Sequence, residues 1–378
     1  MHQPPRKLAC ATIGPSFRPA TADHDQTASL QRPQAVHDCV GSQRNVPVTG
    51  VRPTPAVSAD QRPLKLGILY NAHSGRHNKR WAQPDLGADV PAVAAKSDEE
   101  IRAGLVVLAE QDVQLLAVAG GDGTVQSVLS HVMLGGIFAR RPLLALVPTG
   151  STNMTANDVG NVSVKRDGWQ RLQAWAHRPT DIDRRVVERD VLRIDPGGAA
   201  PAFCGMFFGA GAIYNAVEHT QRHLHHYGLR GDVGPGVAFG RFVKAVAIGD
   251  RRLLSPVDVA LCDDMSEPFD EASILLLAST LKTLVLGLRP FWGEEDAPLA
   301  WTAITEGAQG FLRRIPSVCR GRRRRWMTPN HGYRSHNTRH LELRFDGGYI
   351  VDGEFFTARV ADGPVVLSSA GKAGFVNL

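Results

Sequence analysis

A glycine-rich segment around Asp122 has the composition of a phosphate-binding loop. Gly120, Gly121 and Gly123 surround Asp122 directly after the apolar residues 115–119. Glycines let backbone amides approach a phosphate closely, and a helix beginning there adds the positive end of its dipole. A carboxylate in such a loop would repel phosphate unless it binds Mg²⁺ or a hydroxyl proton, which is what phosphoryl transfer requires. The segment therefore favours phosphate binding, and a plain Gly-Asp-Gly turn is the alternative.

Two further segments carry polar side chains that fit the same chemistry. Residues 71–75 (Asn-Ala-His-Ser-Gly) and 148–153 (Pro-Thr-Gly-Ser-Thr-Asn) each follow a short apolar run. In a parallel α/β sheet, ligands bind at the carboxyl ends of the strands, where loops lead into helix N-termini. We therefore expect these two segments to lie at the same edge of the sheet as the loop around Asp122.

Asp352 and Glu354 form a pair of carboxylates late in the chain. A positioned carboxylate can act as the general base that removes a hydroxyl proton. Asp352-Gly353 is also a dipeptide favoured in type I′ hairpin turns, and the apolar residues 349–351 and 355–356 flank it. Under that interpretation Glu354 is a solvated strand residue, and the local sequence leaves both interpretations open.

The elements expected around the early loops define an α/β domain. Apolar runs at 64–70, 115–119 and 143–147 predict strands, and Ser97 followed by Glu100 predicts a capped helix start. Three successive strand–loop–helix units predict a parallel sheet with crossover helices. We place this α/β domain at residues 63–180.

The chain from residue 181 to 365 has a different pattern. Short apolar segments separated by Gly, Pro and Asp predict a β-rich, sandwich-like second domain with a helical insertion around 216–249. The expected strands are 186–194, 203–208, 257–261, 273–278, 341–345, 349–351 and 354–360. Residues 272–288 are too short for a membrane-spanning helix and contain Lys282, so they also favour buried strands.

Residues 1–62 are predicted to be a disordered leader. They hold eight of the 24 prolines and one aromatic residue, with no periodic apolar pattern. No apolar core of a secretory signal is present in them. Five scattered cysteines without a C-x-x-C pair fit a reducing, cytoplasmic environment and argue against a zinc ribbon.

The net charge of +6 arises from one stretch of the sequence. Residues 307–341 contain nine arginines and no Asp or Glu, and the remainder is mildly acidic. A distributed basic footprint for nucleic acid is therefore absent, and we expect no nucleic-acid partner. The local run at Arg320, Arg322, Arg323, Arg324 and Arg325 fits an anionic membrane surface, with Trp326 as an interfacial anchor. A solvated loop is the alternative.

Together these motifs resemble the diacylglycerol kinase catalytic-domain family, which includes bacterial lipid kinases and sphingosine kinases. Residues 71–75 are similar to its N-P-x-S-G opening, 120–124 match G-G-D-G-T, and 148–153 are similar to P-x-G-[ST]-x-N. Residues 352–354 match its D-G-E, and all four motifs occur in family order. The resemblance implies an α/β nucleotide domain at residues 63–180 that residues 366–378 complete, a β-sandwich-like domain and a cleft between them.

The resemblance also implies roles for individual residues. Asp122 would take part in catalysis or bind Mg²⁺, and Glu354, supported by Asp352, would be the general base. Two departures stand out, because Ala72 replaces the family's proline and Met154 replaces an aspartate that many bacterial members carry. The residues implied to hold ATP are Asn71, Ser74, Gly75, Gly120, Gly121, Asp122, Gly123, Thr124, Val125, Gln126, Gly150, Ser151, Thr152 and Asn153.

The function implied is an ATP- and Mg²⁺-dependent lipid kinase acting on a diacylglycerol-like or sphingoid hydroxyl. We expect a lipid substrate and a peripheral location at the inner face of the membrane. Whether the protein forms a homodimer is left open. Two alternatives keep the fold: a kinase of a soluble acceptor, as in NAD kinases, and a non-catalytic nucleotide- or lipid-binding regulator, which Met154 motivates.

Overall fold

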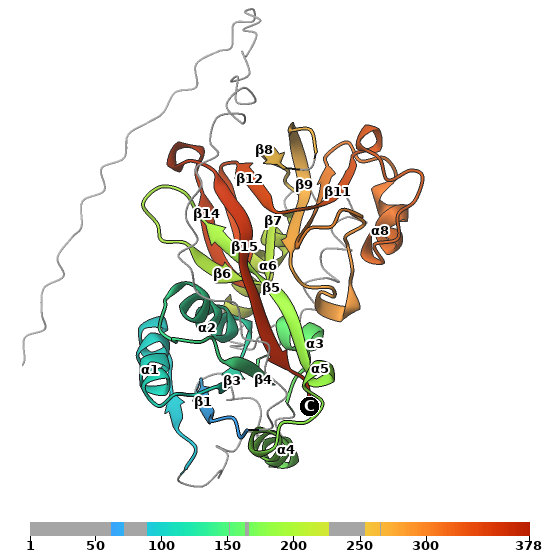
Figure 1. Cartoon of the computed structure of the whole chain (residues 1–378). Coiled ribbons are helices and arrows are strands. Elements are labelled where there is room, and N and C mark those ends of the chain that lie inside the picture. Colours follow the sequence, from blue (N-terminus) through green and yellow to red (C-terminus); the bar gives the residue numbers. More distant parts are fainter. Residues whose placement is uncertain (1–61, 72–88, 151, 163–165, 227–253, 265) are drawn as a thin grey trace, which may run out of the picture. The chain divides into compact units, whose positions relative to one another are not determined.

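The computed structural model describes residues 62–71, 89–150, 152–162, 166–226, 254–264 and 266–378 (Figure 1). All of them belong to one unit of the chain, Val36–Leu378. The predicted leader lies outside the described residues except for its last position. Most of the expected helical insertion also lies outside them, because α6 (Ala212–His226) is described and 227–253 are not.

Parallel strands form the first part of the sheet, as the repeated strand–loop–helix pattern predicts. Every residue of β3 is buried, because its apolar run is covered on both faces. The strands run in the order β4-β3-β1-β2. They are β1 (Leu66–Tyr70), β2 (Ala92–Ala94), β3 (Leu115–Gly120) and β4 (Leu143–Pro148).

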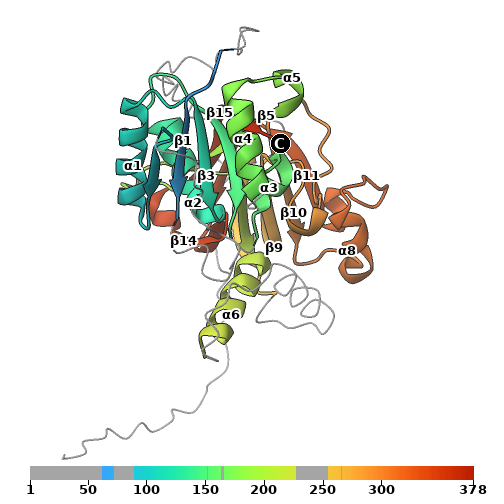
Figure 2. The same ribbon diagram turned by 90° about the horizontal axis from the view of Figure 1, so that it is seen from below.

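Helices cover the two faces of these strands (Figure 2). Leu105 of α1 and Val128 of α2 share a core with Val118 of β3, whereas Trp169 of α4 packs with Ala117 on the opposite face. Successive side chains of β3 point to opposite faces of the sheet, so the strand contributes to two separate apolar cores. The helices are α1 (Asp98–Glu110), α2 (Asp122–Leu134), α3 (Met154–Val159), α4 (Arg166–His177) and α5 (Ile182–Arg185).

The predicted capped start of α1 is confirmed. Ser97 is the N-cap, and its hydroxyl accepts the amide hydrogen of Glu100 at 3.3 Å. The Glu100 carboxylate in turn accepts the amide hydrogen of Lys96 at 2.8 Å. Local hydrogen bonding therefore fixes where this helix begins.

The later strands continue the same hydrogen-bonded network. The order β14-β13-β7-β9-β8-β12-β15 leads into β4, so the second domain does not stand apart as its own sheet. The sandwich-like architecture and the domain boundaries stay predictions. The strands are β5 (Val186–Asp195), β6 (Phe203–Gly205), β7 (Phe207–Gly211), β8 (Val257–Asp263), β9 (Phe269–Ser279), β10 (Leu299–Thr305), β11 (Tyr333–Thr338), β12 (His340–Arg344), β13 (Gly347–Val351), β14 (Glu354–Ala358) and β15 (Val365–Val376).

The C-terminal strand β15 joins the early and late parts of the sheet. It pairs antiparallel with β5 over most of its length, from Val366↔Asp195 to Val376↔Val186. Near its end Phe375 pairs with Leu144 of β4 in parallel orientation. The last residues of the chain therefore lie beside β4, the strand that leads into the second glycine loop.

The strand expected at 203–208 is divided in two. β6 ends at Gly205 and β7 begins at Phe207, because the amides of Met206 and Phe207 donate to Asp352 and not to a neighbouring strand. β10, β11 and helix α8 (Phe311–Cys319) were not predicted from the sequence. None of the helices within the described residues combines the length and apolar character needed to cross a bilayer.

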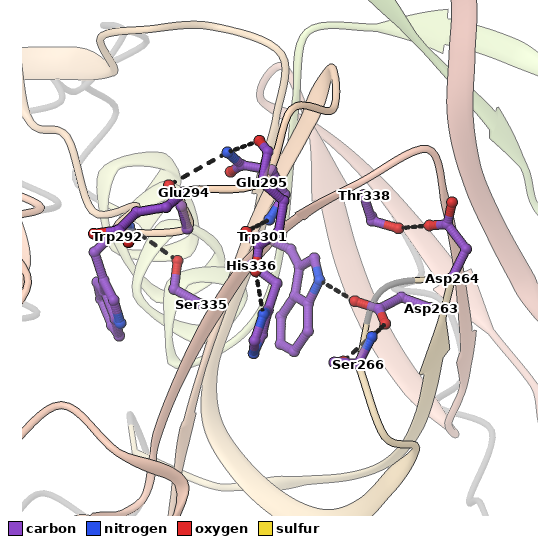
Figure 3. A network of polar contacts seen from close by, with 12 residues as sticks. Asp263, Asp264, Ser266, Trp292, Glu294, Glu295, Trp301, Ser335, His336 and Thr338 are labelled. Atoms are coloured by element: carbon purple, nitrogen blue, oxygen red, sulfur yellow. Dashed lines mark hydrogen bonds and ion pairs between the residues drawn. The ribbon is translucent and has the colours of Figure 1, made fainter.

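A polar network fixes the segment that connects β9 to β10 (Figure 3). Glu295 accepts hydrogen bonds from the amide of Asn337 at 2.8 Å and contacts His336 Nδ1 at 2.7 Å. On the same side of the sheet, the indole of Trp301 donates to Asp263 at 2.7 Å. The contacts of Glu295, together with the hydrogen bond from the Trp292 amide to the Ser335 hydroxyl, hold residues 292–296 against β11.

Candidate functional site

The two glycine loops meet at the carboxyl ends of β3 and β4. The amide of Thr149 donates to the carbonyl oxygen of Gly120 at 3.1 Å. A Cβ on Gly150 would stand 2.6 Å from the Cα of Gly121, closer than any side chain could be accommodated. Glycine is required there because the two backbones touch. The predicted meeting of the loops at one sheet edge is therefore observed.

Asp122 is the first residue of α2, and its carboxylate connects α2 to α3. Oδ2 accepts the amide hydrogen of Met154 at 3.1 Å, and Oδ1 accepts that of Thr155 at 3.3 Å. Both bonds satisfy amides at the start of α3 that have no partner within the helix. Burial raises the pKa of Asp122, and these hydrogen bonds oppose the rise.

Asn153 and Asn71 hold their loops by side-chain hydrogen bonds. Asn153 has a left-handed backbone (φ 47°), its Oδ1 accepts from the amide of Gly150 at 3.0 Å, and its Nδ2 donates to the Gly150 carbonyl at 2.6 Å. Nδ2 of Asn71 donates to the hydroxyl of Thr124 at 3.1 Å. Ser74, Gly75 and Ser151 lie outside the described residues.

Three remaining residues of the implied ATP site take part in local packing. Val125 is buried in the core, and its amide donates to the carbonyl of Gly121 within α2. The carbonyl of Gln126 accepts from the hydroxyl of Ser130 at 2.9 Å, and that of Thr152 accepts from an asparagine side chain at 3.3 Å. Their contribution to ATP binding stays a prediction.

Asp352 and Gly353 form the two-residue turn of the β13–β14 hairpin. Val351 pairs with Glu354, and the turn residues have φ of 50° and 95°. The hairpin predicted from Asp-Gly is therefore present. The Asp352 side chain is nevertheless buried, since Oδ2 accepts from the amide of Met206 at 2.8 Å and Oδ1 from that of Phe207 at 3.0 Å.

Burial makes Asp352 an unusual carboxyl. It raises the pKa of Asp352 well above the ordinary value, and the nearby charge of Asp122 raises it further. The hydrogen bonds from Met206 and Phe207 oppose both effects. The hairpin turn and the glycine loop thus bring two acidic groups close enough to influence each other.

Glu354 lies against the first turn of α2. A Cβ on Gly123 would stand 2.6 Å from Oε1 of Glu354, so the carboxylate occupies the space that a side chain at Gly123 would need. Glu354 is solvent-exposed. The structure therefore brings Glu354, Asp352 and Asp122 together from positions far apart in the sequence, and their chemical roles stay predictions.

Ser130, Gly205 and Ser279 support this arrangement, and no local motif points to them. The amide of Cys204 donates to the hydroxyl of Ser130 at 2.9 Å, which fixes α2 against β6. A Cβ on Gly205 would stand 2.9 Å from Oδ2 of Asp352. The hydroxyl of Ser279 donates to the carbonyl of Met206 at 2.7 Å. These contacts position the backbone that holds Asp352.

Asp158 does not take the place of the aspartate that Met154 replaces. Its Oδ2 forms an ion pair with Arg189 Nε at 2.9 Å, and its Oδ1 accepts from the amide of Thr283 at 2.8 Å. Both carboxylate oxygens therefore hold α3 to β5 and to the segment after β9. Met154 itself is buried.

The site fits a phosphate chain that brings its own magnesium. α2 begins with Gly121 as N-cap, and no side chain caps its first amides, which are the groups that a helix N-terminus offers to an anion. Within the described residues there is no group of three His, Cys, Asp or Glu that could hold a metal by itself. Mg²⁺ usually keeps waters and binds through one or two carboxylates together with substrate phosphates. The carboxylate of Asp122 suits that type of binding, and its role as a metal ligand stays a prediction.

Comparisons with known proteins show which family this chain resembles. Residues 65–184 match the family model of the diacylglycerol kinase catalytic domain, which confirms the resemblance. A diacylglycerol kinase of Staphylococcus carnosus is 24% identical over 189 residues, covering 47% of this chain and 53% of that protein. One from Staphylococcus saprophyticus is 24% identical over 223 residues, covering 56% and 63%. The chain thus spans between half and two thirds of the length of these relatives.

Solved structures share the fold. A crystal structure of a diacylglycerol kinase from Bacillus anthracis aligns with a TM-score of 0.52 at 15% identity, covering 84% of this chain and 97% of that chain. A second Bacillus anthracis structure aligns with a TM-score of 0.57 at 14% identity, covering 84% and 98%. Identities this low are evidence for the fold alone.

Proposed function

We propose, from the diacylglycerol kinase catalytic domain that residues 65–184 match, that this chain is an ATP-dependent lipid kinase. It would transfer the γ-phosphoryl group to the hydroxyl of a diacylglycerol-like or sphingoid lipid. The observation that carries the proposal is the position of Glu354 against Gly123, at the N-terminus of α2. A proton acceptor thereby lies beside the backbone amides best placed to hold phosphates.

The glycine loops and the start of α2 would hold the phosphate chain of ATP. Gly121 and Gly150 leave room for backbone approach, and the first amides of α2 would donate to phosphate oxygens. Asp122 would contact Mg²⁺ carried by those phosphates. When bound, Mg²⁺ neutralises part of the phosphate charge, which phosphoryl transfer requires.

Glu354 would accept the proton of the lipid hydroxyl. The hydroxyl oxygen then forms a bond to the γ-phosphorus, the bond between that phosphorus and the bridging oxygen breaks, and ADP leaves. Asp352 does not reach the acceptor in this scheme, because its side chain is buried and accepts the amides of Met206 and Phe207. It is a positioning residue that fixes the turn before Glu354.

The test is transfer of radiolabelled γ-phosphate from ATP to a lipid panel. The panel should contain diacylglycerol, ceramide and a sphingoid base in mixed micelles, with Mg²⁺. Glu354→Gln is expected to lower kcat by about 100-fold or more, the range of general-base catalysis, while ATP binding persists. Glu110→Gln is the matched control, since Glu110 is an exposed glutamate at the end of α1.

The alternatives give different results in the same assay. A kinase of a soluble acceptor would be active without micelles and would leave every lipid unlabelled. A non-catalytic regulator would bind ATP and label nothing. Either result overturns the lipid-kinase proposal.

A further inference from the structure

We propose that a surface around Leu286 docks this protein onto an anionic lipid bilayer. We call this surface the basic tip, and define it by Leu286, Arg289, Arg322, Arg324 and Arg325. The inference goes beyond the proposed function, because docking requires no phosphoryl transfer. The partner is the lipid surface, and Leu286 is the residue that enters this surface.

Leu286 is an exposed apolar side chain held out by its backbone. Its exposed fraction is 60%, the highest among the large apolar residues that the structure describes. Its φ of 57° lies in the left-handed region, which bulky residues rarely adopt. The amide of Leu284 donates to the carbonyl of Leu288 at 2.7 Å and closes the loop beneath it. Leu284 itself is buried, so the loop is anchored below its exposed tip.

The arginine run is packed beside this loop. The amide of Arg289 donates to the carbonyl of Cys319 at 2.8 Å, at the end of α8. A Cβ on Gly321 would overlap the carbonyl oxygens of Arg289 and Phe291. Arg322 follows directly, so the segment after α8 and the loop that carries Leu286 form one surface.

The charge of the basic tip is open to solvent. Arg289, Arg322, Arg324 and Arg325 are exposed and have no ion-pair partner among the described residues. Arg323 differs, because it pairs with Glu294 at 2.9 Å, and Glu294 adjoins the polar network of Figure 3. That ion pair fixes the run at one point and leaves its neighbours unneutralised.

Trp326, expected from the sequence to be the interfacial anchor, is engaged within the protein. The Arg314 guanidinium lies 4.4 Å from its ring centroid, and its ring meets that of Tyr333 edge-on at 5.1 Å. The exposed apolar residue beside the arginines is instead Leu286. An aliphatic tip surrounded by arginines suits the boundary between headgroups and acyl chains. A nucleic acid backbone offers no apolar layer for Leu286.

The loop of Leu286 begins at the candidate site. The hydroxyl of Ser279 and the amide of Thr280 both donate to the carbonyl of Met206, at 2.7 Å and 3.2 Å. The amide of Met206 donates to Asp352. Leu286 follows Ser279 by seven residues. Docking at the basic tip would therefore hold the Asp352 hairpin near the membrane surface, where a lipid acceptor is found.

The experiment is sedimentation of the full chain with vesicles in the absence of ATP. Vesicles of phosphatidylcholine alone are compared with vesicles that also contain phosphatidylglycerol. Each arginine near an anionic surface contributes about five-fold in affinity, so the triple variant Arg322→Gln/Arg324→Gln/Arg325→Gln is expected to bind anionic vesicles about 100-fold more weakly. Leu286→Asn, which keeps a residue suited to left-handed backbone, is expected to lose about ten-fold.

Matched controls distinguish the effect of the basic tip on vesicle binding from effects of net charge and of misfolding. Arg102→Gln/Arg140→Gln/Arg178→Gln removes the same charge from exposed arginines elsewhere, and Val107→Gln removes an exposed apolar side chain from α1. Both controls are expected to lose less than two-fold. Equal losses in the controls, unchanged binding in the Leu286 and arginine variants, or preferential binding of duplex DNA would overturn the proposal. Kinase assays with a short-chain acceptor in neutral detergent test the proposed function separately.

Discussion

Glu354 and Gly123 face each other across the site, and the glutamate carboxylate fills the space where Gly123 has no side chain. A Cβ at Gly123 would stand 2.6 Å from Oε1 of Glu354. The contact joins the β13–β14 hairpin to the helix that follows the glycine loop. It explains why glycine suits this helical position, where glycine otherwise costs about 1 kcal/mol relative to alanine.

Gly123→Ala is therefore expected to lower the activity of the protein without lowering its stability. The displaced atom is the end of a flexible side chain, so the protein should fold with an unchanged or slightly higher free energy of unfolding. The Glu354 carboxylate must move, and kcat for lipid phosphorylation should fall at least ten-fold. Gly307→Ala, at an open position, is the control. Full activity in Gly123→Ala would contradict the proposed role of Glu354 as the general base.

Asp352→Asn is expected to change how stability depends on pH. Burial and the charge of Asp122 raise the pKa of Asp352 in the folded protein. A carboxyl with a higher pKa when folded binds more protons in the folded state, so its contribution to stability is lost as pH rises from about 4, the unfolded value, toward the folded pKa. Asp352→Asn should therefore show a smaller decrease in the free energy of unfolding over that range.

Urea unfolding at several pH values measures this slope. The Asn side chain has one acceptor oxygen for two backbone amides, so the variant should also lose about 1–3 kcal/mol at the acidic end. Asp112→Asn is the matched control, because Asp112 has the same left-handed backbone (φ 53°) and is exposed. Parallel slopes for the parent and Asp352→Asn would contradict the buried, proton-binding state of Asp352.

The parts of the fold that the sequence predicts are those set by local patterns. The continuous apolar run before Gly120 predicts β3, Ser97 and Glu100 predict the start of α1, and Asp352-Gly353 predicts a hairpin turn. Each of these depends on residues within a few positions of one another. They are confirmed in the structure.

The site geometry depends on contacts between distant residues. No local signal indicates that Asp352 accepts the amides of Met206 and Phe207, and that contact also divides the strand expected at 203–208. β11 was missed because its arginine, histidine and asparagine residues resemble a polar loop. Its polar side chains find partners on other segments, such as Glu295 for His336. Motif resemblance named Glu354 but could not place it beside Gly123.

Arg189→Met is expected to destabilise the protein strongly through Asp158. The Asp158 side chain is 2% exposed, so removal of Arg189 leaves a buried charge without its partner. The expected loss is about 3–5 kcal/mol in the free energy of unfolding. Adding Asp158→Asn should recover part of it, since Asn can still accept from Thr283. Arg193→Met, which breaks the exposed 3.9 Å pair with Asp195, should cost less than about 1 kcal/mol.

Met154→Asp tests whether Asp122 lies at a metal position, without relying on catalysis. Met154 is buried beside the Asp122 carboxylate, whose pKa burial already raises. A second acid there should lower the free energy of unfolding by about 2 kcal/mol in the absence of Mg²⁺. Millimolar Mg²⁺ with a non-hydrolysable ATP analogue should then raise the melting temperature of Met154→Asp more than that of Met154→Asn, because binding to the folded state alone stabilises it. Equal shifts in the two variants would place the metal away from Asp122.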